Sequence, residues 1–326
     1  MSTPALSTAG TAAPTATPAG IAAAAVAALA FVVLVPVLLG DHPYFLNVLT
    51  NASVLSFASL GVWVTFSIGR VNIAQGAFAM IGGYTTAILS TRYGLSWWLC
   101  LPLSAAVAAA VGALIGWPIL RLRGVYFAMV TLSLTEAVRL AFLNGGEFTQ
   151  GASGIVNIPR PAGIDSPVAF FVLSAVLLVL GLVAVWRLAN SRLGWVFRSL
   201  RQNEELASSI GIDVARYRVL AFAFCSGMGG IAGAFFAAFH QNIYPASYTV
   251  ADSINFMLYC FLGGLDFVLV PMVGAFLLVI AFELLGALQQ YQALLYGVLM
   301  IAVMLFLPNG LLSLGRLFAG RSGDGR

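Results

Sequence analysis

Long apolar runs separated by short polar loops dominate the pattern of hydrophobic and polar positions along this chain. Ten runs can be delimited, most of them long enough to cross a bilayer as a helix. Their approximate bounds are 21–39, 46–68, 73–90, 97–120, 125–143, 168–186, 219–239, 247–265, 267–285 and 293–307. The eighth and ninth runs meet at Gly263-Gly264-Leu265-Asp266 and could instead form a re-entrant pair. The pattern therefore predicts an all-α, polytopic membrane protein with eight to ten spans.

The ends of the chain differ in character from this membrane domain, which we place at residues 21–312. Residues 1–20 are mostly Ala, Thr, Pro, Ser and Gly without charge, and we expect a disordered tail there. The apolar run that begins at residue 21 exceeds the core of a signal peptide, so it is expected as a retained span. Residues 313–326 are expected to form a cytoplasmic tail.

Ten spans divide into two halves of five, and an odd number per half would invert the second half relative to the first. Such inverted repeats are common in transporters. Gly76-Ala77-Phe78 in the first half and Gly233-Ala234-Phe235 in the second are similar. We hold two inverted five-helix repeats as a hypothesis.

Composition excludes several classes of protein. Of the 326 residues 61% are hydrophobic and only 8% are charged, whereas soluble domains have about 25% charged residues. All 15 basic residues are Arg, so the chain has no P-loop lysine and is not expected to be an enzyme that hydrolyses ATP. Neither the three Cys nor the two His cluster, so no disulfide, metal or cofactor is expected.

Arginine is distributed unevenly among the loops, which predicts the orientation in the membrane. If both termini are cytoplasmic, the cytoplasmic side holds twelve of the 15 Arg, and the outer side holds two. The twelve are Arg70, Arg121, Arg123, Arg187, Arg192, Arg198, Arg201, Arg216, Arg218, Arg316, Arg321 and Arg326. The modest net charge of +4 therefore reflects topology, and no nucleic-acid partner is expected.

One long cytoplasmic segment, residues 187–218, holds nine charges in 32 residues. Apolar and charged positions alternate in it at spacings that suit one or two short amphipathic helices. One interpretation is a helix lying in the membrane interface, with Trp195 and Phe197 among the headgroups. The other is a helix that docks a soluble subunit.

Four motifs along the chain can be compared with known patterns. The first is Glu205-Leu206-Ala207-Ser208-Ser209-Ile210-Gly211-Ile212, which matches E-A-A-x-x-x-G-I except that Leu206 replaces the first Ala. The others are Asn72-x-x-Gln75-Gly76-Ala77-Phe78, Gly82-Gly83-Tyr84-Thr85, and the stretch that runs from Gly124 to Arg139. Together they resemble the permease subunits of branched-chain amino-acid ABC importers of the LivM type, which engage their ATPases with the E-A-A-x-x-x-G-I segment. The resemblance covers about residues 46–312.

The resemblance implies a non-catalytic permease that forms half of a translocation path in a bacterial cytoplasmic membrane. The implied partners are two ATPase subunits, a second homologous permease, an extracytoplasmic binding protein and the lipid bilayer. The implied cargo is a hydrophobic amino acid, with urea, amides or aromatic acids as alternatives. ATPase coupling would involve Arg201, Glu204, Glu205, Ala207, Gly211 and Ile212.

Two departures from the family pattern concern loops. The outer T-G-G-x-x-G-I motif reads Thr149-Gln150-Gly151-Ala152-Ser153-Gly154-Ile155 here, and a later Gly-rich turn has Asp266 and Val270 in place of Gly. We expect the outer loop, with Gly151, Ser153 and Gly154, to cap the path or meet the binding protein.

Two sets of residues inside spans are candidates for the translocation path or its gate. The first set, in or just before the third span, is Asn72, Gln75, Gly76 and Gly83. The small residues there either allow close packing of helices, or they line a pore together with Gln75. Glu136 and Arg139 are an i, i+3 pair near the middle of a span and are expected to neutralise each other on a face turned into the bundle or a wet cavity. The pair is either a buried structural pair, or it has a role in gating or in contacting a zwitterionic substrate.

A different class of function is an ion-coupled secondary transporter. Such a protein usually has acidic or His relays near the membrane middle, and apart from Glu136 this chain offers few. A membrane enzyme would need a metal cluster or an activated nucleophile, which the sequence does not indicate.

Overall fold

A computed structural model describes residues 31–37, 40, 42–263, 268–284 and the isolated positions 291, 294, 297 and 298. The expected tails, the turn at Asp266, and most of the first and last expected spans, 21–39 and 293–307, lie outside the described residues. The total number of spans and the two inverted repeats therefore stay predictions.

Helices make up most of the described chain, as the sequence predicts. The expected runs from the second to the ninth correspond to α2 (Pro43–Ser67), α3 (Gln75–Arg92), α4 (Trp97–Ile119), α5 (Val125–Leu143), α6 (Pro167–Asn190), α9 (Val214–His240), α10 (Val250–Gly263) and α11 (Val270–Leu284). By length and composition, five described helices can cross a membrane: α2, α4, α5, α6 and α9. The fold is that of a multi-pass membrane protein.

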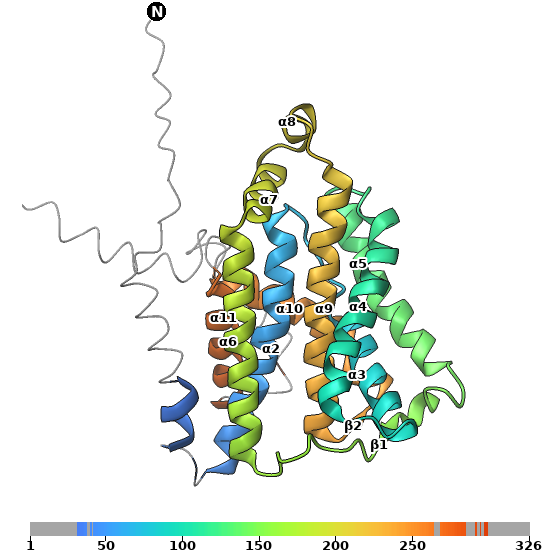
Figure 1. Cartoon of the computed structure of the whole chain (residues 1–326), viewed down its shortest axis with the longest axis vertical. Coiled ribbons are helices and arrows are strands. Elements are labelled where there is room, and N and C mark those ends of the chain that lie inside the picture. Colours follow the sequence, from blue (N-terminus) through green and yellow to red (C-terminus); the bar gives the residue numbers. More distant parts are fainter. Residues whose placement is uncertain are drawn as a thin grey trace, which may run out of the picture.

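The two ends of this helix bundle carry different short elements (Figure 1). At one end α7 (Arg192–Gln202) and α8 (Glu204–Ser209) connect α6 to α9. At the other end β1 (Ile155–Val156) pairs antiparallel with β2 (Asn242–Ile243), flanked by the 3-10 turns η1 (Gly151–Ser153) and η2 (Pro245–Ser247). The charged segment and the outer loop thus lie at opposite ends, as the orientation analysis requires.

Helix α9 lies at the centre and packs against α2, α3 and α4. Close approach depends on glycine: a Cβ on Gly82 of α3 would collide with the backbone of Gly230, and one on Gly233 would collide with the carbonyl of Ala79. Small residues allow helices to approach this closely without a hydrophobic driving force in lipid. The third span therefore uses Gly82 for packing, which was one of the two interpretations of its glycines.

Helix α5 lies at the periphery of the chain. In its most apolar 18-residue window only 17% is buried, compared with 61% in α9. Its exposed side chains include Val125, Tyr126 and Met129. This face is left for lipid or for another protein.

The connection between α2 and α3, residues 68–74, is mostly buried although it is not helical. Its residues 70–74, here named the buried link, lead to the start of α3, and all but Val71 are buried. Helix α3 therefore begins at Gln75, two residues later than the apolar pattern predicts. Non-helical backbone in a membrane protein needs hydrogen-bond partners from neighbouring protein, and the link has them.

Candidate functional site

The segment between α6 and α9 is built from short helices that begin with side-chain caps. The Oγ of Ser191 accepts a hydrogen bond from Gly194 N at the start of α7, and Asn203 Oδ1 accepts one from Leu206 N at the start of α8. Asp213 Oδ1 accepts from Arg216 N where α9 begins. Such caps satisfy otherwise free N–H groups at the start of each helix. The expectation of one or two short helices in this segment is confirmed, because α7 and α8 lie there.

Gly211 ends α8 through its backbone conformation. Its φ is +87°, and the N–H groups of Gly211 and Ile212 donate to the carbonyls of Ser208 and Ala207 at 3.0 and 3.1 Å. This is the Schellman arrangement, which favours glycine at the left-handed position. No atom lies within 4 Å of a Cβ built on Gly211, so backbone geometry rather than lack of space requires glycine there.

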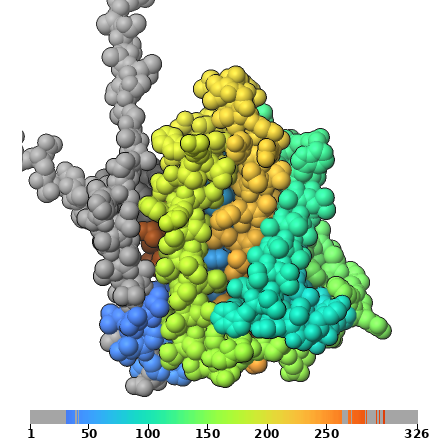
Figure 2. Space-filling view, in the orientation of Figure 1, coloured from blue at the N-terminus to red at the C-terminus, as the bar shows by residue number. Residues whose placement is uncertain are grey.

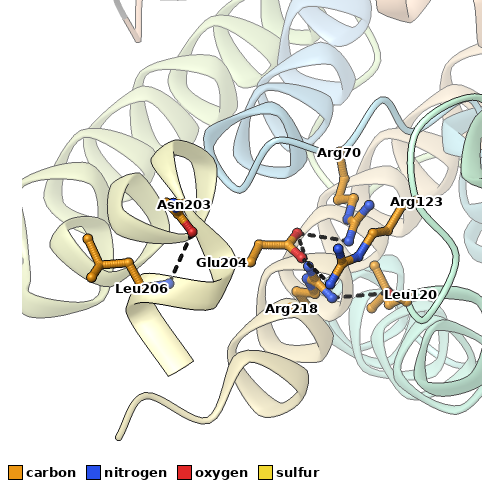
Figure 3. A network of polar contacts seen from close by, with 7 residues as sticks. All are labelled: Arg70, Leu120, Arg123, Asn203, Glu204, Leu206 and Arg218. Carbon is orange, nitrogen blue, oxygen red and sulfur yellow. Dashed lines mark hydrogen bonds and ion pairs between the residues drawn. The ribbon is translucent and has the colours of Figure 1, made fainter. Parts of the chain in front are cut away.

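Glu204 at the start of α8 lies among three arginines from different parts of the chain (Figure 3). Its Oε1 is 2.9 Å from Arg70 Nη2 of the buried link and forms an ion pair with Arg218 of α9, while its Oε2 is 3.4 Å from Arg123 Nη2. Arg218 also donates to the carbonyl oxygen of Leu120 at 3.4 Å. These four charged residues, here named the Glu204 cluster, attach α8 to the bundle.

The Glu204 cluster holds two positive charges in excess. Burial, followed by repulsion from Arg123, lowers the pKa of the Arg70 guanidinium. The negative charge of the Glu204 carboxylate offsets part of the repulsion among the arginines. Its hydrogen bonds to them are charge-assisted and therefore stronger than neutral hydrogen bonds. Removal of Glu204 would leave three like charges converging on one site.

Two large apolar residues lie on the side of α8 that is turned away from the bundle, among exposed polar residues. Leu206 and Ile210 lie four residues apart and are 64% and 71% exposed, and residues four apart share one face of a helix. Figure 2 shows this part of the chain at the tip of the molecule. Glu205 is also exposed.

Ala207, which is expected to take part in ATPase coupling, faces the bundle. It is 2% exposed and belongs to the hydrophobic core of this chain. Ile212 packs against the same core. Arg201 is exposed, and its Cα lies 3.5 Å from the position of a Cβ on Gly69. These contacts show that one side of the α7–α8 segment is committed to its own bundle.

The interfacial interpretation of α7 is wrong for one of its two aromatic residues. Phe197 is 3% exposed and lies in the core, together with Leu200. Trp195 is exposed, with the guanidinium of Arg198 4.7 Å from its ring centroid. Only the Trp195 side of α7 is thus available to a headgroup region.

Asn72 and Gln75 lie in the core of this chain. Gln75 Nε2 donates to the carbonyl oxygens of Ala58 and Cys225 at 2.7 and 3.3 Å, which joins α3 to α2 and α9. Asn72 Nδ2 is 3.2 Å from the sulfur of Cys225, and Asn72 Oδ1 accepts from Ala74 N at 2.9 Å. Both side chains are fully buried, so in this structure they hold neighbouring helices together.

Gly76 and Gly83 occupy positions of close approach. Gly76 N donates to Ser253 Oγ at 3.0 Å, and a Cβ on Gly76 would collide with that hydroxyl. A Cβ on Gly83 would collide with the side chain of Ile243 in β2 and would lie 3.0 Å from the carbonyl oxygen of Gly233. Close packing therefore explains both glycines.

Glu136 and Arg139 form the expected ion pair, but the pair is not buried within this chain. Arg139 Nε and Nη2 donate to Glu136 Oε2 and Oε1 at 2.9 and 2.6 Å. The side chains are 40% exposed for Glu136 and 27% exposed for Arg139. Glu136 lies on the exposed flank of α5, whereas Arg139, four residues after the buried Thr135, lies at the edge of the side that faces the bundle.

The outer loop folds back against the ends of α5 and α9. Thr149 Oγ1 donates to the carbonyl oxygen of Phe142 at 2.6 Å, and a Cβ on Gly154 would collide with the backbone of Ile243. Gly151 begins the turn η1, and Ser153 ends it with an exposed side chain. Gln150, which replaces the usual Gly, has φ +59°. The backbone at position 150 is thus left-handed, which explains why the motif usually has Gly at this position.

Several important residues were missed as site residues in the sequence. Arg70, Arg123 and Arg218 served only to predict orientation, and nothing in their spacing shows that they converge on Glu204. Thr131, Thr135 and Ser253 are buried hydroxyls that bond to the backbone around the buried link. The i, i+4 spacing of the two threonines on one face of an apolar helix was a signal that could have identified them. Within the described residues, no three His, Cys, Asp or Glu side chains could hold a metal ion.

Comparison with known proteins gives related permeases. The family model "Branched-chain amino acid transport system / permease component" matches residues 44–307. LivM, the high-affinity branched-chain amino acid transport system permease protein of Salmonella typhimurium, is 34% identical over 298 residues, which cover 83% of this chain and 70% of the relative. LivM of Escherichia coli is 33% identical over 318 residues, with 89% and 75% covered.

A more distant relative is the probable branched-chain amino acid transport permease protein LivH of Methanocaldococcus jannaschii, which is 25% identical over 84% of this chain and 93% of its own length. No solved structure gives a significant match. The family model covers most of the chain, and two relatives exceed 30% identity over most of both sequences. This chain therefore belongs to the permease component family of branched-chain amino acid transport systems.

Proposed function

We propose that this chain forms half of the translocation path of an ABC importer for branched-chain amino acids. Two ATP-binding cassette ATPase subunits would power it, a second homologous permease would complete the path, and an extracytoplasmic binding protein would deliver the cargo. Family membership favours this assembly over an ion-coupled transporter that works alone. The observation that carries the proposal is the position of α8, which stands at the tip with Leu206 and Ile210 exposed on its outer side.

The contacts of α8 suit a coupling helix. An exposed pair of large apolar residues, Leu206 and Ile210, can enter a groove in a soluble partner, as amphipathic helices commonly do. The charged Glu205 lies beside them and is available to pair with a basic residue of that partner. Glu204 attaches α8 to the bundle through Arg70 and Arg218, so a force applied to the outer side of α8 would reach the spans.

The peripheral face of α5 suits the second permease. A charged side chain exposed to hydrocarbon costs on the order of 3 kcal/mol on insertion scales. Glu136 and Arg139 neutralise each other, but their exposed polar atoms still favour a protein or water environment over lipid. We therefore place the α5 face against the second permease or along the water-filled path between the two subunits.

The cargo is proposed from the relatives, whose names specify branched-chain amino acids. No described side chain forms an evident clamp for both charges of an amino acid. Selection would then belong to the binding protein, which would dock at the end that carries β1, β2 and the outer loop. Competition of labelled leucine uptake by urea, amides and aromatic acids would separate the alternative cargoes.

Reconstitution tests the proposal. The chain would be purified with its partner subunits, placed in lipid vesicles and assayed for uptake of labelled leucine delivered by the binding protein. We expect uptake only when the ATPase subunits and ATP are present. Uptake by vesicles that contain this chain without any ATPase subunit would contradict the proposal and support an ion-coupled transporter.

Cross-linking tests the docking face directly. A cysteine introduced by Ile210→Cys should cross-link to the ATPase subunit, because Ile210 is on the outward side of α8. The matched control is Val156→Cys, an exposed position in β1 at the opposite end, which should give no such product. The native Cys100, Cys225 and Cys260 are buried and should not react. Equal yields from both variants would count against docking through α8.

A further inference from the structure

The buried link, residues 70–74, is held by polar contacts at both of its ends. At one end Arg70 pairs with Glu204 of α8 at 2.9 Å, and the Arg70 side chain is 4% exposed. Burial keeps competing water away from this ion pair, so the attraction is stronger than at an exposed surface. The link is therefore attached directly to the helix that we assign to ATPase docking.

At the other end, α5 holds both backbone polar groups of one residue. Ile73 N donates to Thr131 Oγ1 at 3.2 Å, and Thr135 Oγ1 donates to the carbonyl oxygen of Ile73 at 3.1 Å. All of these atoms belong to buried residues. Sliding α5 past the link would break both hydrogen bonds, and each buried group left unpaired costs about 1–3 kcal/mol.

A chain of hydroxyl groups reinforces this end. Because Thr135 donates its single proton to Ile73, the Oγ of Ser253 at 3.2 Å must donate to Thr135. Ser253 in turn accepts from Gly76 N at 3.0 Å. This series of hydrogen bonds thus starts at the first turn of α3, passes through Ser253 of α10 and Thr135 of α5, and ends at the buried link.

The link is short and internally braced, so it can pass on a displacement. Only two residues separate Arg70 from Ile73, and the Asn72 side chain fixes the turn by accepting from Ala74 N at 2.9 Å. A long exposed loop would absorb a movement of α8 through changes in its own backbone angles. Residue Thr135 is followed by Glu136, so movement of α5 would also carry the Glu136–Arg139 pair.

We propose that residues 70–74 transmit movement of α8 to α5, with Glu204 and the pair Thr131 and Thr135 as positioning residues at the two ends. This inference rests on the proposed function, because it concerns how ATPase movement reaches the face assigned to the path. A contiguous series of contacts is a physical route only if both ends are energetically coupled. Coupling is what the experiment must measure.

The experiment uses the complete importer in vesicles and measures leucine taken up per ATP hydrolysed. The test chain carries Thr131→Val and Thr135→Val together, which remove both hydroxyls and keep the side-chain shape. We expect the ratio of uptake to ATP hydrolysis to fall on the order of tenfold, a typical coupling magnitude. A chain with Thr131→Ser and Thr135→Ser keeps the hydroxyls and should retain the ratio of the original protein.

The matched control is Thr86→Val. Thr86 and Ser104 are fully buried and their hydroxyls lie 2.8 Å apart, between α3 and α4 and away from the link. The Thr86→Val change removes a buried threonine hydroxyl, as the two valines of the test chain do. It should therefore lower stability without changing the ratio of uptake to ATP hydrolysis. Combining Glu204→Gln with the two valines should lower the ratio no further than the stronger of the two changes alone, because both interrupt one route.

The outcomes separate this inference from the proposed function. If the original complex shows no ATP-dependent uptake, the proposed function fails. If it does, and the valine variant keeps its ratio within about twofold, or Thr86→Val lowers the ratio equally, the link has no transmitting role. Should the valine variant fail to assemble, Val71→Gly serves instead, because it leaves the hydrogen bonds of the link in place and adds backbone freedom. A normal ratio in that variant would likewise overturn the inference.

Discussion

The conformation of a single residue, Gly211, determines how α8 ends. An L-residue with a left-handed backbone costs about 1–2 kcal/mol, and Asn tolerates that conformation better than other side chains. We therefore expect Gly211→Ala to reduce ATP-dependent uptake, because the end of α8 and the contact of Ile212 with the core would shift. The matched variant Gly211→Asn should retain most of the uptake.

Uptake by the assembled complex is the measurement, with the amount of complex as the control for folding. The Asn side chain is larger than that of Ala, so a requirement for small volume would make Asn the more harmful substitution. That order of effects would show that the docking surface, rather than the backbone angle, requires glycine at this position.

Among the elements, the crossing of α3 and α9 depends on the absence of side chains. A Cβ on Gly233 would collide with the backbone of Ala79, and the two helices would have to separate. Overpacking of this kind costs about 1–3 kcal/mol. We expect Gly233→Ala to lower the midpoint temperature at which the purified protein loses its monodisperse chromatographic peak.

Gly227 provides the control on the same helix. A Cβ there would lie 3.4 Å from the carbonyl oxygen of Ala105 and from the Cβ of Ala109, an ordinary contact distance. Because Ala is favoured over Gly in a helix interior by roughly 0.5–1 kcal/mol, Gly227→Ala should leave the midpoint unchanged or raise it. An equal loss in both variants would mean that helix crossing does not limit stability.

For the whole molecule, the Glu136–Arg139 pair reports how the peripheral face of α5 is used. Glu136→Ala leaves Arg139 without its partner, at a cost on the order of 3 kcal/mol if the site is surrounded by hydrocarbon. We expect this variant to lower the yield of assembled complex less than Arg139→Ala does, because the long Arg139 side chain that remains can snorkel towards the interface, whereas the shorter Glu136 side chain cannot.

The double variant separates a structural from a transport role. Replacing both residues with Ala removes the unpaired charge, so assembly should recover if the pair only neutralises itself. Recovered assembly with recovered uptake would identify a structural pair. Recovered assembly without uptake would instead place the pair on the translocation path, where the proposed second permease meets α5.

The sequence alone determined the class of the molecule, the positions of the described helices and the charged segment between α6 and α9. It could do so because a bilayer core requires long apolar helices, and because charge is costly enough there to collect in loops. The motif at residues 205–212 also indicated the family correctly. These features depend on composition and periodicity, which are local properties of the chain.

Tertiary structure decided which residues meet. Arg70, Arg123 and Arg218 are far apart in sequence, and only the packing of the bundle brings them to Glu204. Packing also turned Ala207 inward and placed Glu136 on the periphery. A pattern of residue types can specify that a side chain must be paired or covered, but the identity of its partner depends on long-range contacts that no local pattern contains.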